Sequence, residues 1–324
     1  MTVDLHSDLL ADVVARRFHG ERDVMRRVHL PALRAAGVRV QVLAIFTPTA
    51  LAGEGALRHA LRHVDAALRE EVESEGELRI ATDVAGLDAA LADGALAGIL
   101  SLEGVEALGR EPSLLAPFRR LGVRLAGPTW NRANDYADGA AEDRGAGLTP
   151  LGRRLLEELA VLGIALDLSH LTRRAACDCL ERADGLVLAS HSNARALVPT
   201  VRNLDDDVLR AIGERGGLVG VNAQRAFLGR GEPAALAAQH ARHIAAVAGE
   251  DVPAVGADFT AFLPDSFPEP PELGLPPDAD RSLQRLPEAP RETFYPDLAR
   301  ELGDRASAVL SGNALRFLRR LLGS

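Results

Sequence analysis

The sequence predicts an α/β protein built as one (β/α)8 barrel, a TIM barrel of the metal-dependent hydrolase type, over residues 1–324. The chain has 324 residues, and eight short apolar runs alternate with longer amphipathic stretches. This alternation is typical of parallel β/α units, and eight such units need about 250 residues or more. No shift in composition marks a boundary before residue 262. We therefore expect a single domain.

The apolar runs are the predicted strands. They are Val3–Leu5, Val38–Phe46, Ala97–Leu102, Val123–Thr129, Ile164–Leu168, Leu186–Ala189, Leu218–Val221 and Val252–Gly256. The stretches between and after them predict helices, among them Ala56–Glu75, Leu151–Leu162, Leu204–Glu214, Ala234–Ala248 and a final Ala306–Leu322. Asn203 precedes three aspartates in the first turn of the third of these helices, so we expect it to cap that helix.

Residues 263–290 differ from the rest of the chain. This segment is rich in proline and acidic residues and has no hydrophobic period. It predicts a long irregular loop after the last strand. In a barrel, a loop in this place lies at the mouth of the active site.

Composition excludes several kinds of partner. A net charge of −9 argues against nucleic acid, which requires clustered positive charge, and the scattered arginines argue against anionic membranes. No apolar run approaches the length of a membrane span. Cys177 and Cys179 do not face each other on a helix, so we expect no disulfide and a reducing compartment. Polar residues at Asp4 and His6 argue against a signal peptide. We expect a cytoplasmic protein.

Histidines and carboxylates follow five of the predicted strands directly. They are His6 and Asp8 after the first strand, Glu103 after the third, His170 after the fifth, His191 after the sixth and Asp258 after the eighth. Because the carboxyl ends of parallel strands meet at one face of a barrel, we expect these six side chains in one cavity. Each of them alone is explained by a capping or hydrogen-bonding role. The joint pattern favours a site.

This set of residues suits a pair of zinc ions, which bind imidazole nitrogen and carboxylate oxygen. His6 and Asp8 are two apart on a strand end, so they face the same side and are able to chelate one ion. His170 and His191 are able to hold the second ion. Glu103 has two oxygens and is able to bridge metals about 3.5–4 Å apart.

The sequence contains no lysine, so a carboxylated lysine bridge is impossible here. The bridge must then be a carboxylate, and Glu103 is the candidate at a strand end. Asp258 remains for proton transfer from the attacking water to the leaving amine.

Longer blocks of sequence surround these residues. They include Asp4–Asp8, His29–Pro31, Ser101–Gly104, Gly147–Gly152, Leu166–His170, Ala189–Arg195, Arg202–Leu204, His240–Ile244, Gly256–Phe259 and Tyr295–Leu298. Together, from Asp4 to about Phe317, they resemble the membrane dipeptidase (renal dipeptidase) family of zinc peptidases, in particular its soluble bacterial members.

The resemblance implies a homodimeric enzyme in which a metal-bridging hydroxide attacks the peptide bond of a dipeptide, L,D dipeptides included. It implies one zinc on His6, Asp8 and Glu103, and a second zinc on Glu103, His170 and His191. Asp258 matches the family's acid/base aspartate. Arg202 matches the arginine that pairs with the free carboxylate of the substrate, a role that suits the bidentate geometry of a guanidinium.

Departures from the family pattern at three positions concern the substrate. Mammalian members place a histidine on the substrate carbonyl where this chain has Thr129-Trp130-Asn131, a triplet found in the bacterial subgroup, so we place Trp130 and Asn131 at the substrate. Gln224 and Thr260 also differ from the common residues. The alternatives left open are a binuclear amidohydrolase acting on other amides, N-acyl amino acids or lactams, an inactive metal-binding homologue, and strand ends that bind no metal.

Overall fold

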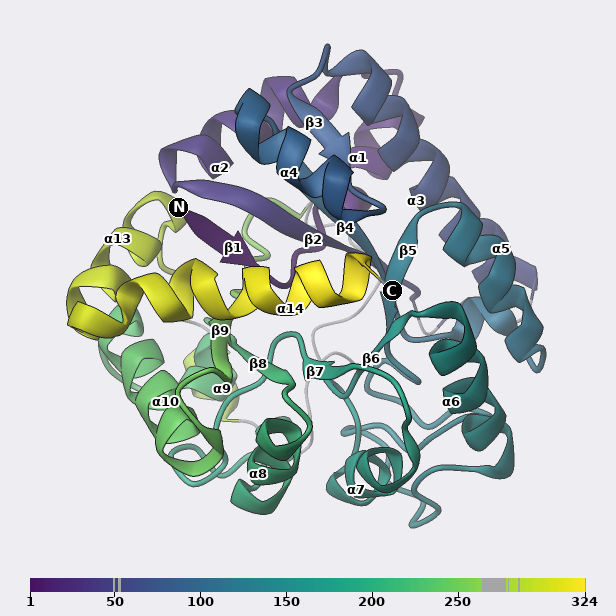
Figure 1. Cartoon of the computed structure of the whole chain (residues 1–324), viewed down its shortest axis with the longest axis vertical. Coiled ribbons are helices and arrows are strands. Elements are labelled where there is room, and N and C mark those ends of the chain that lie inside the picture. Colours follow the sequence, from purple (N-terminus) through teal and green to yellow (C-terminus); the bar gives the residue numbers. More distant parts are fainter. Residues whose placement is uncertain (49, 52–53, 264–277, 279, 285, 324) are drawn as a thin grey trace.

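The computed structural model describes residues 1–48, 50–51, 54–263, 278, 280–284 and 286–323, and within these ranges eight parallel strands close into a barrel (Figure 1). The barrel strands are β1 Thr2–Asp4, β2 Val38–Phe46, β4 Leu96–Glu103, β5 Val123–Ala126, β6 Ala165–Asp167, β7 Val187–Ala189, β8 Leu218–Val221 and β9 Pro253–Val255. Neighbours pair in the order β2-β1-β9-β8-β7-β6-β5-β4, and a parallel pairing of β2 with β4 closes the ring. The predicted fold class is confirmed.

The eight predicted apolar runs coincide with these eight strands, although some bounds differ. The run Val123–Thr129 was expected to be extended throughout, but β5 ends at Ala126. Pro128 has no N–H to donate to a neighbouring strand, which helps to explain the early end. A further strand, β3 Leu78–Ile80, was not predicted. Among the described residues it pairs only with Leu96–Gly98 at the start of β4, and it lies outside the closed ring.

Helices surround the barrel (Figure 1). They are α1 Leu9–Phe18, α2 Leu30–Ala35, α3 Glu54–Glu73, α4 Val84–Asp93, α5 Leu115–Arg120, α6 Pro150–Leu162, α7 Arg173–Arg182, α8 Asp206–Glu214, α9 Arg225–Leu228, α10 Pro233–Ala248, α12 Arg281–Gln284, α13 Arg291–Leu302 and α14 Asn313–Leu322. Short 3-10 or π-helical turns cover Met25–His29, Glu106–Leu108, Pro112–Leu114, Gly303–Arg305 and Ala308–Gly312. Cys177 and Cys179 lie unpaired in α7, as expected.

The predicted helices are found, and their ends follow local chemistry. The Thr149 hydroxyl accepts the Gly152 N–H at 3.0 Å at the start of α6, and Gly163 ends that helix at φ 60°. The prediction that Asn203 caps α8 is wrong, because α8 begins at Asp206 with Asp205 at the N-cap. The Asn203 amide instead donates to the carbonyls of Val198 and Phe227, which ties the preceding loop together.

Two further predictions need correction near the C-terminus. The final helix is not one α-helix, since the π-helical turn Ala308–Gly312 precedes α14. The irregular loop predicted over 263–290 falls partly on residues 264–277, 279 and 285, which lie outside the described residues. Its described part contains the short helix α12 and is therefore not irregular throughout.

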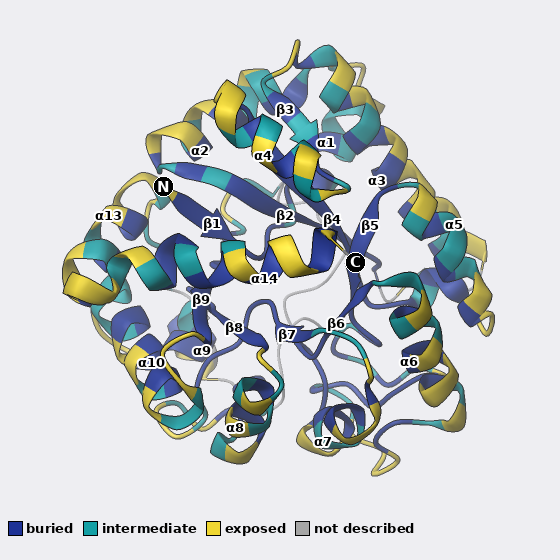
Figure 2. Ribbon diagram, in the orientation of Figure 1, coloured by how far each residue is buried: buried dark blue, intermediate teal, exposed yellow. Residues whose placement is uncertain are grey.

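The core fills the barrel and is covered at one end by α14. Phe317, Leu318 and Leu321 of α14 pack into the same apolar cluster as barrel residues such as Val3 and Ala97, near the starts of their strands. In Figure 1 this helix crosses the front of the barrel, and Figure 2 shows buried strands inside helices whose outer faces are exposed. The amino-terminal end of the barrel is thus covered. No helix within the described ranges has the length and apolar character needed to cross a bilayer.

Candidate metal centre

The carboxyl ends of the strands bring the six predicted polar residues together at the other end of the barrel. Glu103 is the last residue of β4, and the other five lie just beyond β1, β6, β7 and β9. The cluster consists of His6, Asp8, Glu103, His170, His191 and Asp258. Its histidines and Glu103 are buried, whereas the Asp8 and Asp258 side chains are 14% and 16% exposed. The aspartates therefore line the open side of the cluster.

Glu103 occupies the centre. Its Oε1 atom lies 2.8 Å from His170 Nε2, 3.5 Å from His191 Nε2 and 3.6 Å from His6 Nε2. Three imidazoles from three different strands therefore face one carboxylate oxygen. On the other side, His6 Nε2 lies 3.9 Å from Asp8 Oδ2 and 3.6 Å from Asp258 Oδ1.

The donor atoms of this cluster fit a bound cation. His6 Nε2, Asp8 Oδ1 and Glu103 Oε2 are buried and have no hydrogen-bond partner among the described residues. Buried polar atoms are almost always paired, so these atoms lack a positive partner. Two overlapping groups each place three possible ligand atoms within 4.8 Å of one another, namely His6, Glu103 and His191, and His6, Asp8 and Asp258. Imidazole nitrogen with carboxylate oxygen is a typical zinc donor set.

Hydrogen bonds to the far side of two rings turn their Nε2 atoms into the cluster. His170 Nδ1 lies 2.7 Å from the side-chain oxygen of Asn131, so the ring donates its N–H to that oxygen. His191 Nδ1 lies 2.7 Å from the Ser190 hydroxyl. Such partners fix the orientation and tautomer of metal-binding histidines. Sequence reasoning missed this role of Ser190, although the residue directly precedes His191 at the strand end.

Asn131 and Trp130 were both predicted to contact the substrate. The structure places Asn131 behind His170, buried at 1% exposure, where its oxygen orients a ring. Trp130 is half-buried, with its ring centroid 4.6 Å from that of Phe46 and 5.8 Å from that of His170. Trp130 is thus the one of the pair that lies alongside the cluster with part of its surface open.

Unusual backbone geometry marks the same residues. Asn131, His170 and Asp258 have φ angles of 52°, 72° and 58°. These values lie in the left-handed region, which residues other than glycine seldom adopt. Within the described residues only Asp23 and Glu75 share this property. Strained backbone persists where the surroundings hold it, and it gathers at functional sites. The strand ends are bent sharply enough here to aim side chains into the cluster.

Two glycines let the strands close tightly around the residue before His191. A Cβ atom on Gly220 or Gly256 would lie 1.9 Å or 1.8 Å from the Ser190 carbonyl oxygen, well inside contact distance. These two positions at β8 and β9 therefore require glycine. Their backbones in turn fix where His191 leaves β7.

Electrostatics in the metal-free cluster follow from burial and proximity. Burial raises the pKa of Glu103 well above its usual range, partly opposed by His6. Burial also lowers the pKa values of His170 and His191. At His6 the effect of burial is outweighed by Glu103 and the aspartates, which raise its pKa to about 10. The carboxylates of the metal-free cluster therefore favour a positive charge beside them, as the raised pKa of His6 indicates.

Asp258 lies in a position suited to proton transfer. Burial raises the pKa of its carboxyl group to about 7, against the opposing effect of His6. Asn222 donates from its amide nitrogen to Asp258 Oδ2 at 3.0 Å, and Gln224 donates to the Asp258 carbonyl oxygen at 2.5 Å. A carboxyl group with a pKa near neutral is able to both accept and release a proton at working pH.

Arg202 supplies a buried positive charge at the edge of the cluster. One of its terminal nitrogens lies 3.0 Å from His170 Nε2, and its guanidinium carbon lies 5.4 Å from the centre of the Phe227 ring. Burial lowers its pKa, and Asp258, Glu103 and Asp167 oppose this from a distance. In the part of the chain that the structure describes, no carboxylate forms an ion pair with this guanidinium.

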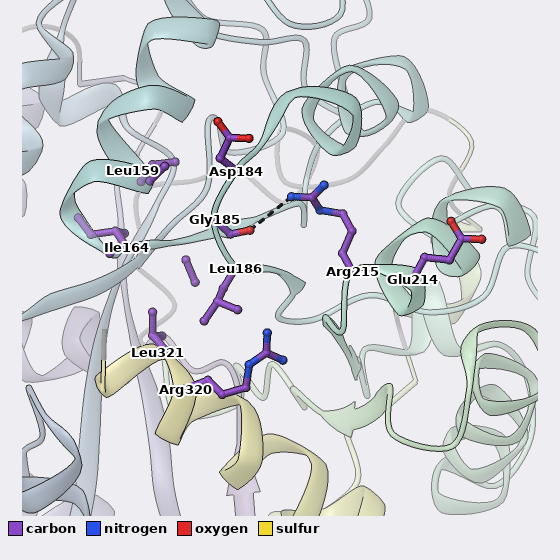
Figure 3. Close-up of a pocket in the computed structure, with 12 residues that line it drawn as sticks. Leu159, Ile164, Asp184, Gly185, Leu186, Glu214, Arg215, Arg320 and Leu321 are labelled. Atoms are coloured by element: carbon purple, nitrogen blue, oxygen red, sulfur yellow. Dashed lines mark hydrogen bonds between the residues drawn. The ribbon is translucent and has the colours of Figure 1, made fainter.

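A separate hollow lies at the opposite end of the barrel. This cavity of about 530 Å³ lies among α6, α8 and α14 and is lined by residues such as Leu159, Arg215 and Arg320 (Figure 3). Its lining also includes the segments that immediately precede β6 and β7. Residues before the strands lie away from residues after them, so this cavity is not part of the metal cluster.

A closed (β/α)8 barrel with a histidine and carboxylate cluster at its carboxyl end defines the class of metal-dependent hydrolases. Comparison with known sequences narrows the class. Residues 1–272 match the profile described as "Membrane dipeptidase (Peptidase family M19)". The chain belongs to this family of metallopeptidases, as the sequence motifs indicated.

Individual relatives agree with this membership. Dipeptidase 3 of Mus musculus is 28% identical over 332 residues, which cover 98% of this chain and 62% of the mouse protein. The crystal structure of dipeptidase AC, a metallopeptidase of family M19, has a TM-score of 0.84 at 27% identity and covers 100% of this chain and 99% of its own. A metallopeptidase from Rhodobacter sphaeroides, solved with a phosphinate mimic of the dipeptide L-Ala-D-Ala, has a TM-score of 0.83 at 26% identity, with 99% of both chains covered.

Proposed function

We propose that this chain is a binuclear zinc dipeptidase that hydrolyses dipeptides with a free C-terminal carboxylate, L,D dipeptides among them. One observation carries the proposal. A single oxygen, Glu103 Oε1, faces the Nε2 atoms of three imidazoles, and the Arg202 guanidinium lies beside one of them. The inclusion of L,D dipeptides is supported by the relative that was solved with a mimic of L-Ala-D-Ala.

Two groups of residues would hold the ions. His6, Asp8 and Glu103 would bind one zinc, and Glu103, His170 and His191 the other. When bound, the ions supply a Lewis acid for the scissile carbonyl and lower the pKa of a bound water to about 7. The lone pairs left without partners at His6 Nε2 and Glu103 Oε2 support this assignment.

The chain's own side chains then orient the substrate and move the proton. Arg202 holds the free carboxylate of the dipeptide through two parallel hydrogen bonds, which restricts substrates to short peptides. Asp258 takes the proton from the attacking water at its carboxylate and delivers it to the leaving amine nitrogen. Trp130 covers the side of the substrate next to His170. The homodimer and the cytoplasmic location stay predictions.

A panel of L,L and L,D dipeptides tests the proposal, with zinc added and with Asp258→Asn as the control. We expect hydrolysis by the native protein, a loss of at least about a hundredfold in kcat for Asp258→Asn, and two zinc ions per chain by elemental analysis. Cleavage of N-acyl amino acids or lactams without any dipeptide cleavage would favour the alternative of an amidohydrolase that acts on other amides. Absence of bound metal after gentle purification would contradict both the dipeptidase and the amidohydrolase hypotheses.

A further inference from the structure

A carboxylate outside the predicted site lies against the segment that carries Asp258. Glu288 lies between α12 and α13, beyond residues 1–272 that match the family profile. The Thr260 N–H lies 3.1 Å from both Glu288 oxygens, and the Ala261 N–H donates at 3.0 Å. The Thr260 hydroxyl donates at 2.5 Å, and the Gln224 amide at 2.9 Å. One side chain thus gathers four donors from two strand-end loops.

Gln224 connects this carboxylate to Asp258. Its Nε2 atom donates to the Asp258 carbonyl oxygen at 2.5 Å, and it also approaches Glu288 Oε1 and, at 3.2 Å, Thr260 Oγ1. An amide nitrogen has two hydrogens, so one serves Asp258 and the other points to Glu288 and Thr260. A flipped amide would set its oxygen against the Glu288 carboxylate. Glu288 therefore fixes the amide in the orientation that holds Asp258.

Asp258 is the residue that requires such support. Its φ of 58° costs free energy that the surroundings must offset. In this conformation its carboxylate lies 3.6 Å from His6 Nε2 and accepts the Asn222 amide at 3.0 Å. Were the backbone to relax, the carboxylate would move away from the cluster.

We propose that Glu288 is a positioning residue: through Gln224 and the backbone N–H groups of Thr260 and Ala261, it holds Asp258 in its left-handed conformation with the carboxylate aimed at the cluster. This inference rests on the proposed function, in which Asp258 carries the proton. Gln224 and Thr260 are among the positions that depart from the common family residues.

The test is Glu288→Gln in the zinc-loaded full chain. The new side chain brings an NH2 group, itself a donor, toward groups that donate to Glu288 in the native protein. The Gln224 amide therefore loses its fixed orientation. We expect kcat to fall about tenfold to a hundredfold, the range for misplacing a reacting group. The KM and the zinc content stay unchanged, because neither Arg202 nor any predicted ligand loses a contact. Glu288→Asp keeps the charge and restores part of the kcat.

Two further variants make the result specific. Glu292→Gln removes the same charge from an exposed position in the first turn of α13 and is expected to behave as the native protein. Gln224→Ala removes the donor to Asp258 and is expected to lower kcat as Glu288→Gln does. The double variant is expected to have a kcat no lower than that of the more impaired single variant, because both substitutions remove the same support of Asp258.

Two results in solution overturn the inference. The first is a kcat within twofold of native for Glu288→Gln. The second is a loss of kcat that is accompanied by proportional losses of thermal stability and zinc content, since a residue that only stabilises the fold would give that result. A crystal structure of Glu288→Gln decides independently of activity. It is expected to show Asp258 out of its left-handed conformation and separated from Asn222, whereas an unchanged Asp258 refutes the idea. If the native protein cleaves no dipeptide, the proposed function is wrong. The crystal structure of Glu288→Gln still tests whether Glu288 holds the conformation of Asp258.

Discussion

The Nε2 atoms of His170 and His191 face each other at a distance of 2.7 Å. His170 Nδ1 donates its hydrogen to Asn131, so in the neutral ring Nε2 carries only a lone pair. His191 Nδ1 bonds to the Ser190 hydroxyl, which is able to hold that ring in the same tautomer. Two lone pairs directed at each other repel unless a cation or a proton lies between them. This arrangement supports the proposal that the two rings bind one metal ion.

Replacing one ring of this pair is expected to remove one metal ion. For His191→Ala we expect elemental analysis to find one zinc per chain in place of two, since His6, Asp8 and Glu103 remain. We expect kcat/KM to fall by more than about a hundredfold, because loss of partners that merely orient ligands already costs 10–100-fold. His243→Gln is the matched control, since this histidine pairs with Asp206 outside the cluster. Retention of both ions by His191→Ala would contradict the assignment.

Asn131 offers a test between orienting a ligand and contacting substrate. For Asn131→Leu, which cannot accept the His170 N–H, we expect zinc affinity to fall about 10–100-fold. Asn131→Asp keeps an acceptor oxygen in place and is expected to retain zinc. Zinc affinity is measured by competition with a chelating dye. If Asn131→Leu binds zinc normally and only KM rises, the residue contacts substrate, as the sequence analysis predicted.

Much of this site could be predicted because of how parallel strands meet. Glu103, His170 and His191 directly follow apolar runs, and a barrel necessarily gathers such positions at one end. Sequence also indicated Asp258, whose strand lies next to β1 in the closed ring. What sequence could not show is contacts that depend on loop conformation. The 2.7 Å contact between Asn131 and His170 is an example, since it joins residues 39 apart through a left-handed turn.

The departures have physical causes as well. Strand β3 was missed because Arg79 lies between its two apolar residues, so Leu78–Ile80 is not a continuous apolar run. The cap predicted at Asn203 was wrong because α8 begins only at Asp206, with Asp205 at the N-cap, and Asn203 lies in the preceding loop, where its amide nitrogen donates to the carbonyls of Val198 and Phe227. Glu288 could not be recognised, because its partners come from a different part of the chain. Long-range hydrogen bonds of this kind leave no local pattern.

Arg202 is expected to set the requirement for a free carboxylate. For Arg202→Met, which keeps much of the bulk beside Phe227, we expect KM for a dipeptide to rise about a hundredfold with a smaller change in kcat, because a lost charged hydrogen bond is worth about 1.5–3 kcal/mol. The matching substrate is the same dipeptide with its C-terminus amidated. Native and variant enzymes are expected to hydrolyse this amide at similarly low rates. A native enzyme that cleaves the amide as fast as the acid would exclude the role.

A last prediction concerns stability and pH, and it rests on His240 of α10. Its buried ring accepts the Ala194 N–H at 3.1 Å through Nδ1 and donates through Nε2 to the Leu228 carbonyl at 3.2 Å. Burial lowers the pKa of this ring from 6.5 to about 4. The folded state therefore favours neutral histidine, whereas the unfolded chain binds a proton more readily.

The sign follows from proton linkage. The contribution of His240 to the free energy of unfolding is fully present well above pH 6.5 and is lost as the pH falls toward 4. Between pH 7.5 and 5.0 this loss amounts to about 2 kcal/mol. His240→Gln is able to make both hydrogen bonds but does not titrate, so its stability is expected to fall less over the same interval. Urea unfolding at the two pH values, with EDTA present so that zinc release does not contribute, measures the difference. His63, whose pKa burial also lowers to about 4, contributes equally to both proteins. Equal losses for native protein and variant would mean that the His240 ring is not held neutral by the fold.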